Sequence, residues 1–251
     1  MNQITGVAAG VPYIALPPAD TTKPAPMIAV WHLMDAPASE EAMAAAVPMH
    51  GLPAWRVYFG LPMTGGRALP EGEYFRLASE DAVMNAYHPQ TEQGADEFPA
   101  ALAQLRKELP IPDGPVGIAG GSSGSMIAYE ITARAEVPIF AAAFISPVTQ
   151  LTPLIAANER RYGVTFTWTD ENRAVADRYD YVRRADEIKV PATLIVGELD
   201  DIAIREPAQH LHKASDVELV TIPGMRHEFA DENGPLVDAE LVRWFSQYLP
   251  S

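Results

Sequence analysis

Residues 116–128 read VGIAGGSSGSMIA, and this stretch decides the fold that we expect for the chain. Its first half is a short apolar run typical of a buried strand, and its second half suits a helix. The pattern Gly120-x-Ser122-x-Gly124 lies between the two. This spacing favours a strand that turns sharply into a helix, with one serine at the apex and small residues on either side. On this pattern alone, a glycine-rich connector is an equally good interpretation.

The segments around this stretch alternate between strand patterns and helix patterns. Buried strands are predicted at residues 27–33, 54–61, 138–145, 191–196 and 217–222, with one or two edge strands at 7–16. Helices are predicted after Ser39 and at residues 79–87, 95–109, 123–134, 204–214 and 235–249. The alternation predicts an α/β fold, with a mostly parallel sheet of about eight strands, or slightly fewer, and helices on both faces.

The chain shows no repeat, linker or low-complexity tract, so we take residues 1–251 as a single domain. Residues 149–187 are polar and mostly helical in pattern, and they lie between two predicted strands. We therefore expect them to form a small lid-like insert over one end of the sheet. In parallel sheets ligands bind at the carboxyl ends of the strands, and Ser122 is expected at such an end.

The composition bounds the class of partner. Of the 251 residues, 48% are hydrophobic, which is enough for a sizeable core. The formal net charge of -15 would repel the phosphates of nucleic acids and of anionic membranes. We therefore expect no nucleic acid or membrane partner and a small neutral molecule as substrate, and we attribute the acidity mainly to a solvated surface.

The chain contains no cysteine, which excludes disulfides, thiolate nucleophiles and cysteine metal sites. The first residues carry neither a basic region nor a long apolar segment, so no signal peptide is predicted. The longest apolar runs are too short to span a bilayer. A soluble cytoplasmic protein is the expectation.

Two further strand ends carry side chains that could activate Ser122. A serine hydroxyl is a weak nucleophile unless a base removes its proton, and that base is usually a histidine oriented by a carboxylate. Asp200 and His227 each follow an apolar run, so both would project beyond the same edge of the sheet as Ser122. The three residues therefore form a candidate nucleophile, acid and base.

These segments together resemble the α/β-hydrolase fold superfamily, and the resemblance covers roughly residues 26–249. The nucleophile elbow corresponds to GGSSG at 120–124, the acid motif Gly-x-x-Asp to GELD at 197–200, and the histidine motif Pro-Gly-x-x-His to PGMRH at 223–227. The order of nucleophile, acid and histidine also matches. The resemblance implies a serine-esterase-like triad of Ser122, Asp200 and His227, and motif position favours Asp200 over Glu198 and Asp201.

The chain departs from the superfamily after the predicted strand at 27–33. Many members carry His-Gly there, and the loop supplies one amide of the oxyanion hole, whereas this chain has Trp31-His32-Leu33-Met34. By position, the Leu33 N–H takes this role, with Met34 as the neighbouring possibility. The resemblance implies the Ser123 N–H as second donor. His32 is expected to be a polar residue at a strand end, or a group that shapes the oxyanion loop.

Residues that line the substrate pocket are expected from the oxyanion loop, the insert and the histidine loop. We place Met34, Tyr162, Trp168 and Met225 there. The aromatic residues of the insert have a second interpretation, because Tyr162, Phe166 and Trp168 could equally form a small core within it. The insert is modest in size, and bulk at Leu33 and Met34 would crowd the acyl side, so short acyl chains are favoured.

The resemblance predicts a serine hydrolase that cleaves small neutral carboxylic esters through an acyl-enzyme, without a metal or an organic cofactor. The serine excludes reactions that other members run with an aspartate or a cysteine at the elbow, such as halide displacement, epoxide opening and dienelactone hydrolysis. Lactonase, thioesterase, amidase and small-peptide hydrolase activities on the same triad stay open. So does a different class, a slow-turnover ligand-binding or sensor protein that keeps the triad.

Overall fold

The computed structural model describes residues 3–229 and 232–250, and one eight-stranded sheet runs through it in the order β1-β2-β4-β3-β5-β6-β7-β8. Six strands are parallel: β3 (Met27–Trp31), β4 (Trp55–Phe59), β5 (Val116–Gly121), β6 (Ile139–Ile145), β7 (Ala192–Gly197) and β8 (Glu218–Ile222). At one edge β1 (Ile4–Ala8) and β2 (Val11–Leu16) form an antiparallel hairpin that pairs with β4. This topology confirms the mostly parallel sheet that the sequence predicts.

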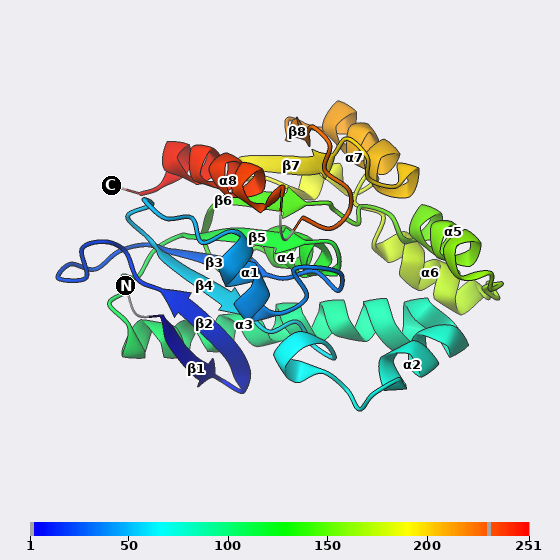
Figure 1. Ribbon diagram of the computed structural model, residues 1–251, viewed down its shortest axis with the longest axis horizontal. Helices are drawn as coiled ribbons and strands as arrows, with labels where there is room; N and C mark the ends of the chain where they lie inside the picture. The colour runs from blue at the N-terminus through cyan, green and yellow to red at the C-terminus, as the bar shows by residue number, and fades with distance from the viewer. Residues whose placement is uncertain (1–2, 230–231, 251) are drawn as a thin grey trace.

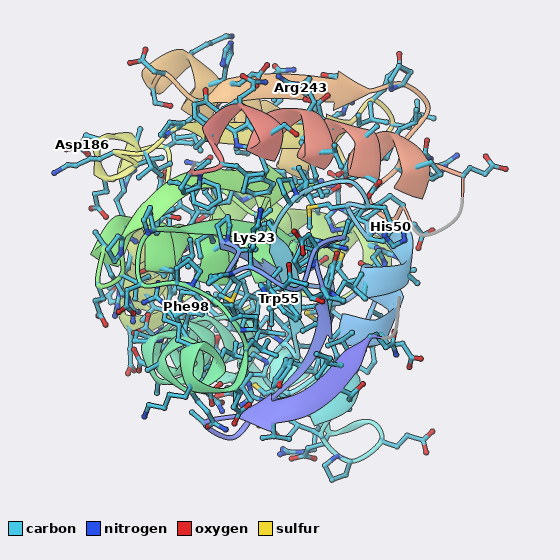
Figure 2. The ribbon with its side chains drawn as sticks, turned by 90° about the vertical axis from the view of Figure 1, so that its left-hand side faces the viewer. Lys23, His50, Trp55, Phe98, Asp186 and Arg243 are labelled. Atoms are coloured by element: carbon cyan, nitrogen blue, oxygen red, sulfur yellow. The ribbon has the colours of Figure 1, made fainter. Side chains whose placement is uncertain are left out.

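Helices cover both faces of the sheet (Figure 1). One face carries α1 (Glu40–Ala46) and α8 (Gly234–Tyr248), and their buried residues share one apolar cluster. The other carries α3 (His88–Glu108), α4 (Ser123–Arg134) and α7 (Ile202–Ala214), which pack into the larger cluster. In the end view of Figure 2, Arg243 of α8 and Phe98 of α3 lie far apart, on the two helical layers. Ser39 caps α1, because its hydroxyl accepts the Ala42 N–H at 3.1 Å.

Two helices begin earlier than the sequence predicts. The expected helix at 79–87 is α2 (Glu73–Ala82) followed by a π-helical turn, η2 (Val83–Tyr87); the short η1 (Gly65–Arg67) precedes both. The helix expected from residue 95 is α3, which begins at His88. Pro89 fits its first turn, where no N–H is needed, and Gly94 permits close packing on Ile127, whose side chain a Cβ would meet.

Residues 149–187 connect β6 to β7 and contain α5 (Leu151–Tyr162), α6 (Asp170–Arg178) and the short η3 (Ala185–Glu187). Because the segment leaves the carboxyl end of β6, it lies over the edge of the sheet at which the parallel strands finish. Figure 1 shows α2, α5 and α6 gathered at this end, while both chain ends lie at the opposite one. Within the described residues, no helix has the length and apolar character needed to cross a membrane.

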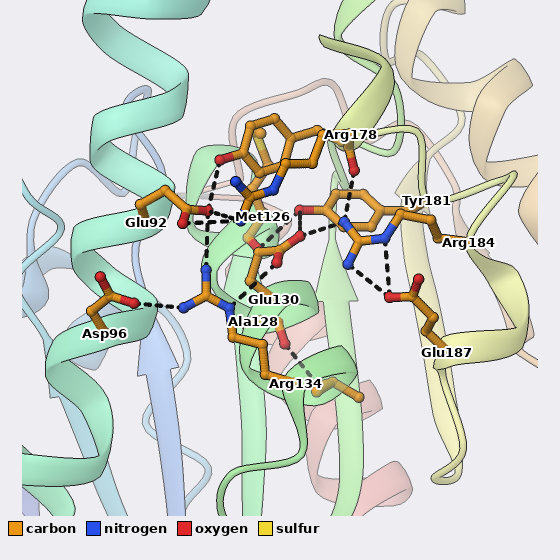
Figure 3. Close-up of polar contacts among 12 residues, drawn as sticks. Glu92, Asp96, Met126, Ala128, Glu130, Arg134, Arg178, Tyr181, Arg184 and Glu187 are labelled. Carbon is orange, nitrogen blue, oxygen red and sulfur yellow. Dashed lines mark hydrogen bonds and ion pairs between the residues drawn. The ribbon is translucent and has the colours of Figure 1, made fainter. Parts of the chain in front are cut away.

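An ion network joins the return segment of the insert to the helices beneath it (Figure 3). Its centre is Glu130 of α4, whose side chain is 2% exposed. Glu130 accepts hydrogen bonds from the Arg184 guanidinium at 2.7 Å and the Tyr181 hydroxyl at 3.1 Å, and its second oxygen lies 3.5 Å from Arg134 Nε. Arg134 also pairs with Glu92 of α3 at 3.0 Å. The network therefore fastens the insert to α3 and α4.

We expect Glu130→Ala to lower the free energy of unfolding by about 2 kcal/mol, because it leaves two partly buried guanidinium groups without their shared carboxylate. Urea denaturation with an unchanged m-value measures this loss. Glu80→Ala is the matched control, since its pair with Arg76 is exposed and its removal should leave the midpoint unchanged. Equal midpoints for both variants would contradict a stabilising network.

Candidate active site

Ser122 occupies the turn between β5 and α4 with backbone angles φ 48° and ψ -119°, in a region that residues with side chains rarely adopt. Close packing enforces this conformation. A Cβ at Gly120 would collide with the Gly124 carbonyl, and a Cβ at Gly124 would lie 2.8 Å from the Trp31 carbonyl oxygen. The Ser122 N–H donates to the Ile145 carbonyl at 2.9 Å. The strand-turn-helix arrangement predicted from the glycine spacing is therefore present, with the serine at its apex.

Three residues from three strand ends meet at this turn. His227 Nε2 lies 2.8 Å from Ser122 Oγ, and His227 Nδ1 lies 3.0 and 3.1 Å from the two carboxylate oxygens of Asp200. Asp200 is 3% exposed and Ser122 is 6% exposed, while 23% of the His227 side chain reaches solvent. The hydrogen bonds form one continuous chain from hydroxyl to imidazole to carboxylate.

The two alternative acids have other partners. Asp201 caps α7, because its carboxylate accepts the Ala203 N–H at 2.8 Å. Glu198 accepts the Gly224 N–H at 2.9 Å. Within the described part of the chain, Asp200 is the one of these three carboxylates that contacts His227. The geometry therefore agrees with the position of Asp200 in its motif.

The contacts of His227 determine where its proton lies. A buried carboxylate only accepts, so Nδ1 carries the hydrogen and Nε2 is free to accept the Ser122 hydroxyl proton. Burial lowers the pKa of His227, but the hydrogen bond and charge of Asp200 and the charge of Asp35 outweigh it, and the pKa lies above its ordinary 6.5. Arg161 acts in the opposite direction. The imidazole is thus a stronger base than a free histidine.

The loop after β3, residues 32–37, is the expected oxyanion loop, and its hydrogen bonds differ from the prediction at Leu33. The Leu33 N–H already donates to the Pro37 carbonyl at 3.2 Å, and the Leu33 side chain is fully buried against Gly121. Leu33 is therefore wrong as the first donor. The next N–H along, that of Met34, has no partner among the described residues, and neither has the Ser123 N–H at the start of α4. Both amides are therefore uncommitted, one directly after Ser122 and one in the loop after β3.

His32 holds the oxyanion loop in place. Its ring is fully buried, Nε2 accepts the Leu61 N–H at 3.0 Å, and Nδ1 donates to the Leu33 carbonyl at 2.5 Å. Burial lowers the pKa of His32 more than the Leu33 contact and the Glu40 charge raise it, so the ring stays neutral. His32 is therefore a fully hydrogen-bonded polar residue at the end of β3, as in the first of its two expected roles, and it also links the loop after β3 to the segment after β4, as in the second.

The predicted pocket residues lie in different surroundings. Met225 is fully buried in the core cluster beneath α1 and α8, so its placement in the pocket is wrong. The ring of Trp168 packs edge-on against that of Phe166, with centroids 4.7 Å apart, and both side chains pack against the larger apolar cluster of the domain, so they do not form a core of the insert's own. Tyr162 is 58% exposed, with the Arg161 guanidinium 5.5 Å from its ring.

Two tyrosines that the sequence analysis did not identify lie next to the oxyanion loop and the insert. The Tyr74 hydroxyl of α2 donates to Met34 Sδ at 3.0 Å, and the Tyr87 hydroxyl of η2 accepts from the Asn158 side chain of α5 at 3.3 Å. Burial raises the pKa of Tyr74 far above its usual range, and that of Tyr87 to about 12, so both hydroxyls stay protonated. Tyr74 precedes the helix predicted at 79–87 and Tyr87 ends it, and no motif in this part of the sequence marks either side chain as part of a site.

The described residues hold no cluster of three histidine, aspartate or glutamate side chains that could bind a metal ion. No family model matches the chain, and no curated protein matches its sequence.

Solved structures resemble the chain closely in fold but weakly in sequence. TT1662 from Thermus thermophilus has a TM-score of 0.73 and 17% identity, with 100% of both chains covered. A cold-adapted esterase from an Arctic intertidal metagenomic library has a TM-score of 0.62 and 17% identity, over 99% of this chain and 93% of that one. A puromycin-hydrolyzing peptidase of Mycobacterium tuberculosis has a TM-score of 0.67 and 16% identity, over 98% of this chain and 40% of its own. With the observed strand order, these likenesses show that the chain has the α/β-hydrolase fold.

The charges around His227 predict opposite shifts for two substitutions. Asp35→Asn removes a charge that raises the His227 pKa, so the pKa should fall, whereas Arg161→Gln removes a charge that lowers it, so the pKa should rise. The imidazole resonances followed by NMR against pH measure both values. Shifts in the same direction would contradict this electrostatic account.

Proposed function

We propose that this chain is a serine hydrolase that cleaves small neutral carboxylic esters through an acyl-enzyme. The observation that carries the proposal is the chain of hydrogen bonds from Ser122 Oγ through His227 to Asp200, at 2.8 and 3.0 Å. The three residues stand at the carboxyl ends of β5, β7 and β8, where open parallel sheets bind ligands. Such a constellation is recognised by its geometry and the roles of its groups.

In the first half of the reaction, Ser122 Oγ attacks the ester carbonyl and His227 Nε2 accepts the hydroxyl proton. Asp200 holds the imidazole in the required tautomer and stabilises the imidazolium that forms. When the tetrahedral intermediate collapses, the imidazolium returns the proton to the leaving alcohol. Water activated by the neutral His227 then hydrolyses the acyl-enzyme and restores the serine.

The oxyanion would be stabilised by the backbone N–H groups of Met34 and Ser123. Each such donor contributes about 3–4 kcal/mol to transition-state stabilisation where one has been removed from a serine hydrolase. The Ser123 N–H lies at the N-terminus of α4, whose dipole favours developing negative charge. Both amides are bonded to no other described group, so an oxyanion would find them free.

The substrate class follows from charge and from the walls of the site. A net charge of -15 disfavours anionic substrates, and an ester needs no charged group for this chemistry. The Tyr74 hydroxyl holds the bulky side chain of Met34, the proposed first oxyanion donor, and bulk at that position supports a preference for short acyl groups. Partial burial of Ser122 also keeps bulk water away from the nucleophile.

Multiple turnover of p-nitrophenyl acetate tests the proposal. We expect steady turnover by the wild-type chain and a loss of kcat of about 10⁴-fold or more in Ser122→Ala, because the nucleophile is removed. Ser215→Ala removes a serine hydroxyl at the C-terminal end of α7 that bonds to the Leu211 carbonyl, and this variant should retain the wild-type rate. Slow release of a single equivalent of p-nitrophenol would instead indicate a sensor. Activity confined to thioesters, lactones, amides or peptides would show that the substrate is not an open-chain carboxylic ester.

The rate should also depend on pH in a defined direction. Only the neutral imidazole accepts the Ser122 proton, and the raised pKa of His227 keeps the ring protonated to higher pH than an ordinary histidine. We therefore expect kcat/KM to rise with pH through an apparent pKa above 6.5 and to fall away in acid. A profile that stays flat down to about pH 4 would contradict His227 as the base.

A further inference from the structure

The turn formed by residues 146–148 follows β6 and opens the insert. Ser146 is fully buried, and its backbone has φ 41°, in the left-handed region. Its N–H donates to the Ile195 carbonyl of β7 at 2.8 Å, and its hydroxyl donates to the His227 carbonyl at 3.1 Å. The main chain of the proposed base is thus held by a side chain from another strand end.

The same turn is bonded to the nucleophile through Ser125. This serine is fully buried in the first turn of α4. Its hydroxyl donates to the Ser122 carbonyl at 2.5 Å and accepts the Val148 N–H at 3.0 Å. One hydroxyl therefore connects the main chain of Ser122 to the turn that also holds His227.

We propose that Ser125 and Ser146 are positioning residues that fix the nucleophile and the base relative to each other through the turn at 146–148. The inference rests on the proposed function. Neither hydroxyl contacts the reacting atoms, since both bond to backbone groups. Both are buried, so water cannot replace a lost contact without rearrangement. A displacement of about 1 Å between Ser122 and His227 would cost up to about 100-fold in rate.

The backbone of Ser146 supports a role for its side chain. Glycine adopts a φ of this sign without strain, whereas a residue with a Cβ does so at a cost. A hydroxyl is nevertheless present at this buried position, and the His227 carbonyl is its partner. The conformation and the contact together indicate that the Ser146 hydroxyl serves to hold the main chain of His227.

The hydrogen bonds of Ser125 and Ser146 to the turn at 146–148 and to His227, which we call the brace, also connect the site to the insert. Thr149 begins the insert, directly after the turn, and Tyr181 lies near its end. The Tyr181 N–H donates to the Thr149 carbonyl at 3.0 Å, so the two ends of the insert are joined next to the turn. The Tyr181 hydroxyl in turn reaches Glu130 of the ion network. The residues that fasten the insert and those that align Ser122 with His227 therefore form one continuous set of contacts.

Ser146→Gly is the decisive variant, because it removes the hydroxyl while glycine adopts the positive φ without strain, so the chain should still fold. We expect kcat on p-nitrophenyl acetate to fall about tenfold or more with KM within about twofold, since alignment acts on the chemical step. The pKa of His227 measured by NMR should fall, because a displaced imidazole loses part of its contact with Asp200. Ser125→Ala should give the same pattern.

The matched control is Ser215→Ala, whose hydroxyl donates to the Leu211 carbonyl at 2.7 Å in α7 and should leave kcat and the His227 pKa unchanged. In the double variant of Ser125 and Ser146, the loss should be smaller than the product of the two single losses, as expected for one shared unit. Wild-type kcat and an unchanged His227 pKa in Ser146→Gly would overturn the brace.

The two readouts separate this inference from the proposed function. Absence of Ser122-dependent turnover in the wild-type chain would count against the hydrolase itself. The His227 pKa needs no substrate, so its response to Ser146→Gly tests the brace in either case.

Discussion

The left-handed backbone of Ser122 is the constraint on which the rest of the site depends. It exists because two glycines let β5, α4 and the end of β3 approach within contact of one another. The turn brings the hydroxyl to 2.8 Å from His227 Nε2 and leaves the next amide, the first of α4, uncommitted. The close packing around the turn is what maintains the strained backbone of Ser122.

Around this turn, buried hydrogen bonds fix the positions of Ser122 and His227, and the charges of Asp35 and Arg161 shift the pKa of His227. Asp200 and His227 come from separate loops, yet a side chain donates a hydrogen bond to the main-chain carbonyl of each. Arg205 Nε donates to the Asp200 carbonyl at 2.8 Å, and the Ser146 hydroxyl donates to the His227 carbonyl at 3.1 Å. His32 and Tyr74 hold the oxyanion loop on the other side. The site is thus assembled from several weak contacts whose geometry is enforced by the sheet beneath them, which is the condition for electrostatic preorganisation.

The sheet and the positions of Ser122, Asp200 and His227 at its edge could be predicted. Apolar runs mark buried strands, and residues that directly follow parallel strands lie at the same edge of the sheet. Leu33 could not be separated from Met34, since the choice depends on a local bond to Pro37 that no periodicity records. Met225 follows a strand as the site residues do, but its side chain turns into the core. The roles of Ser125 and Ser146 could not be predicted, because each hydroxyl bonds to a backbone atom far along the chain, at Val148 and at His227.

The central claim is that Ser122 is the nucleophile. Reaction of the folded protein with a fluorophosphonate, followed by mass spectrometry of its peptides, tests it most directly, because the reagent labels a serine only where a base and an oxyanion site assist. We expect a single adduct that fragment ions assign to Ser122, with Ser123 and Ser125 unmodified. No adduct on the folded protein, or an adduct on another serine, would contradict it.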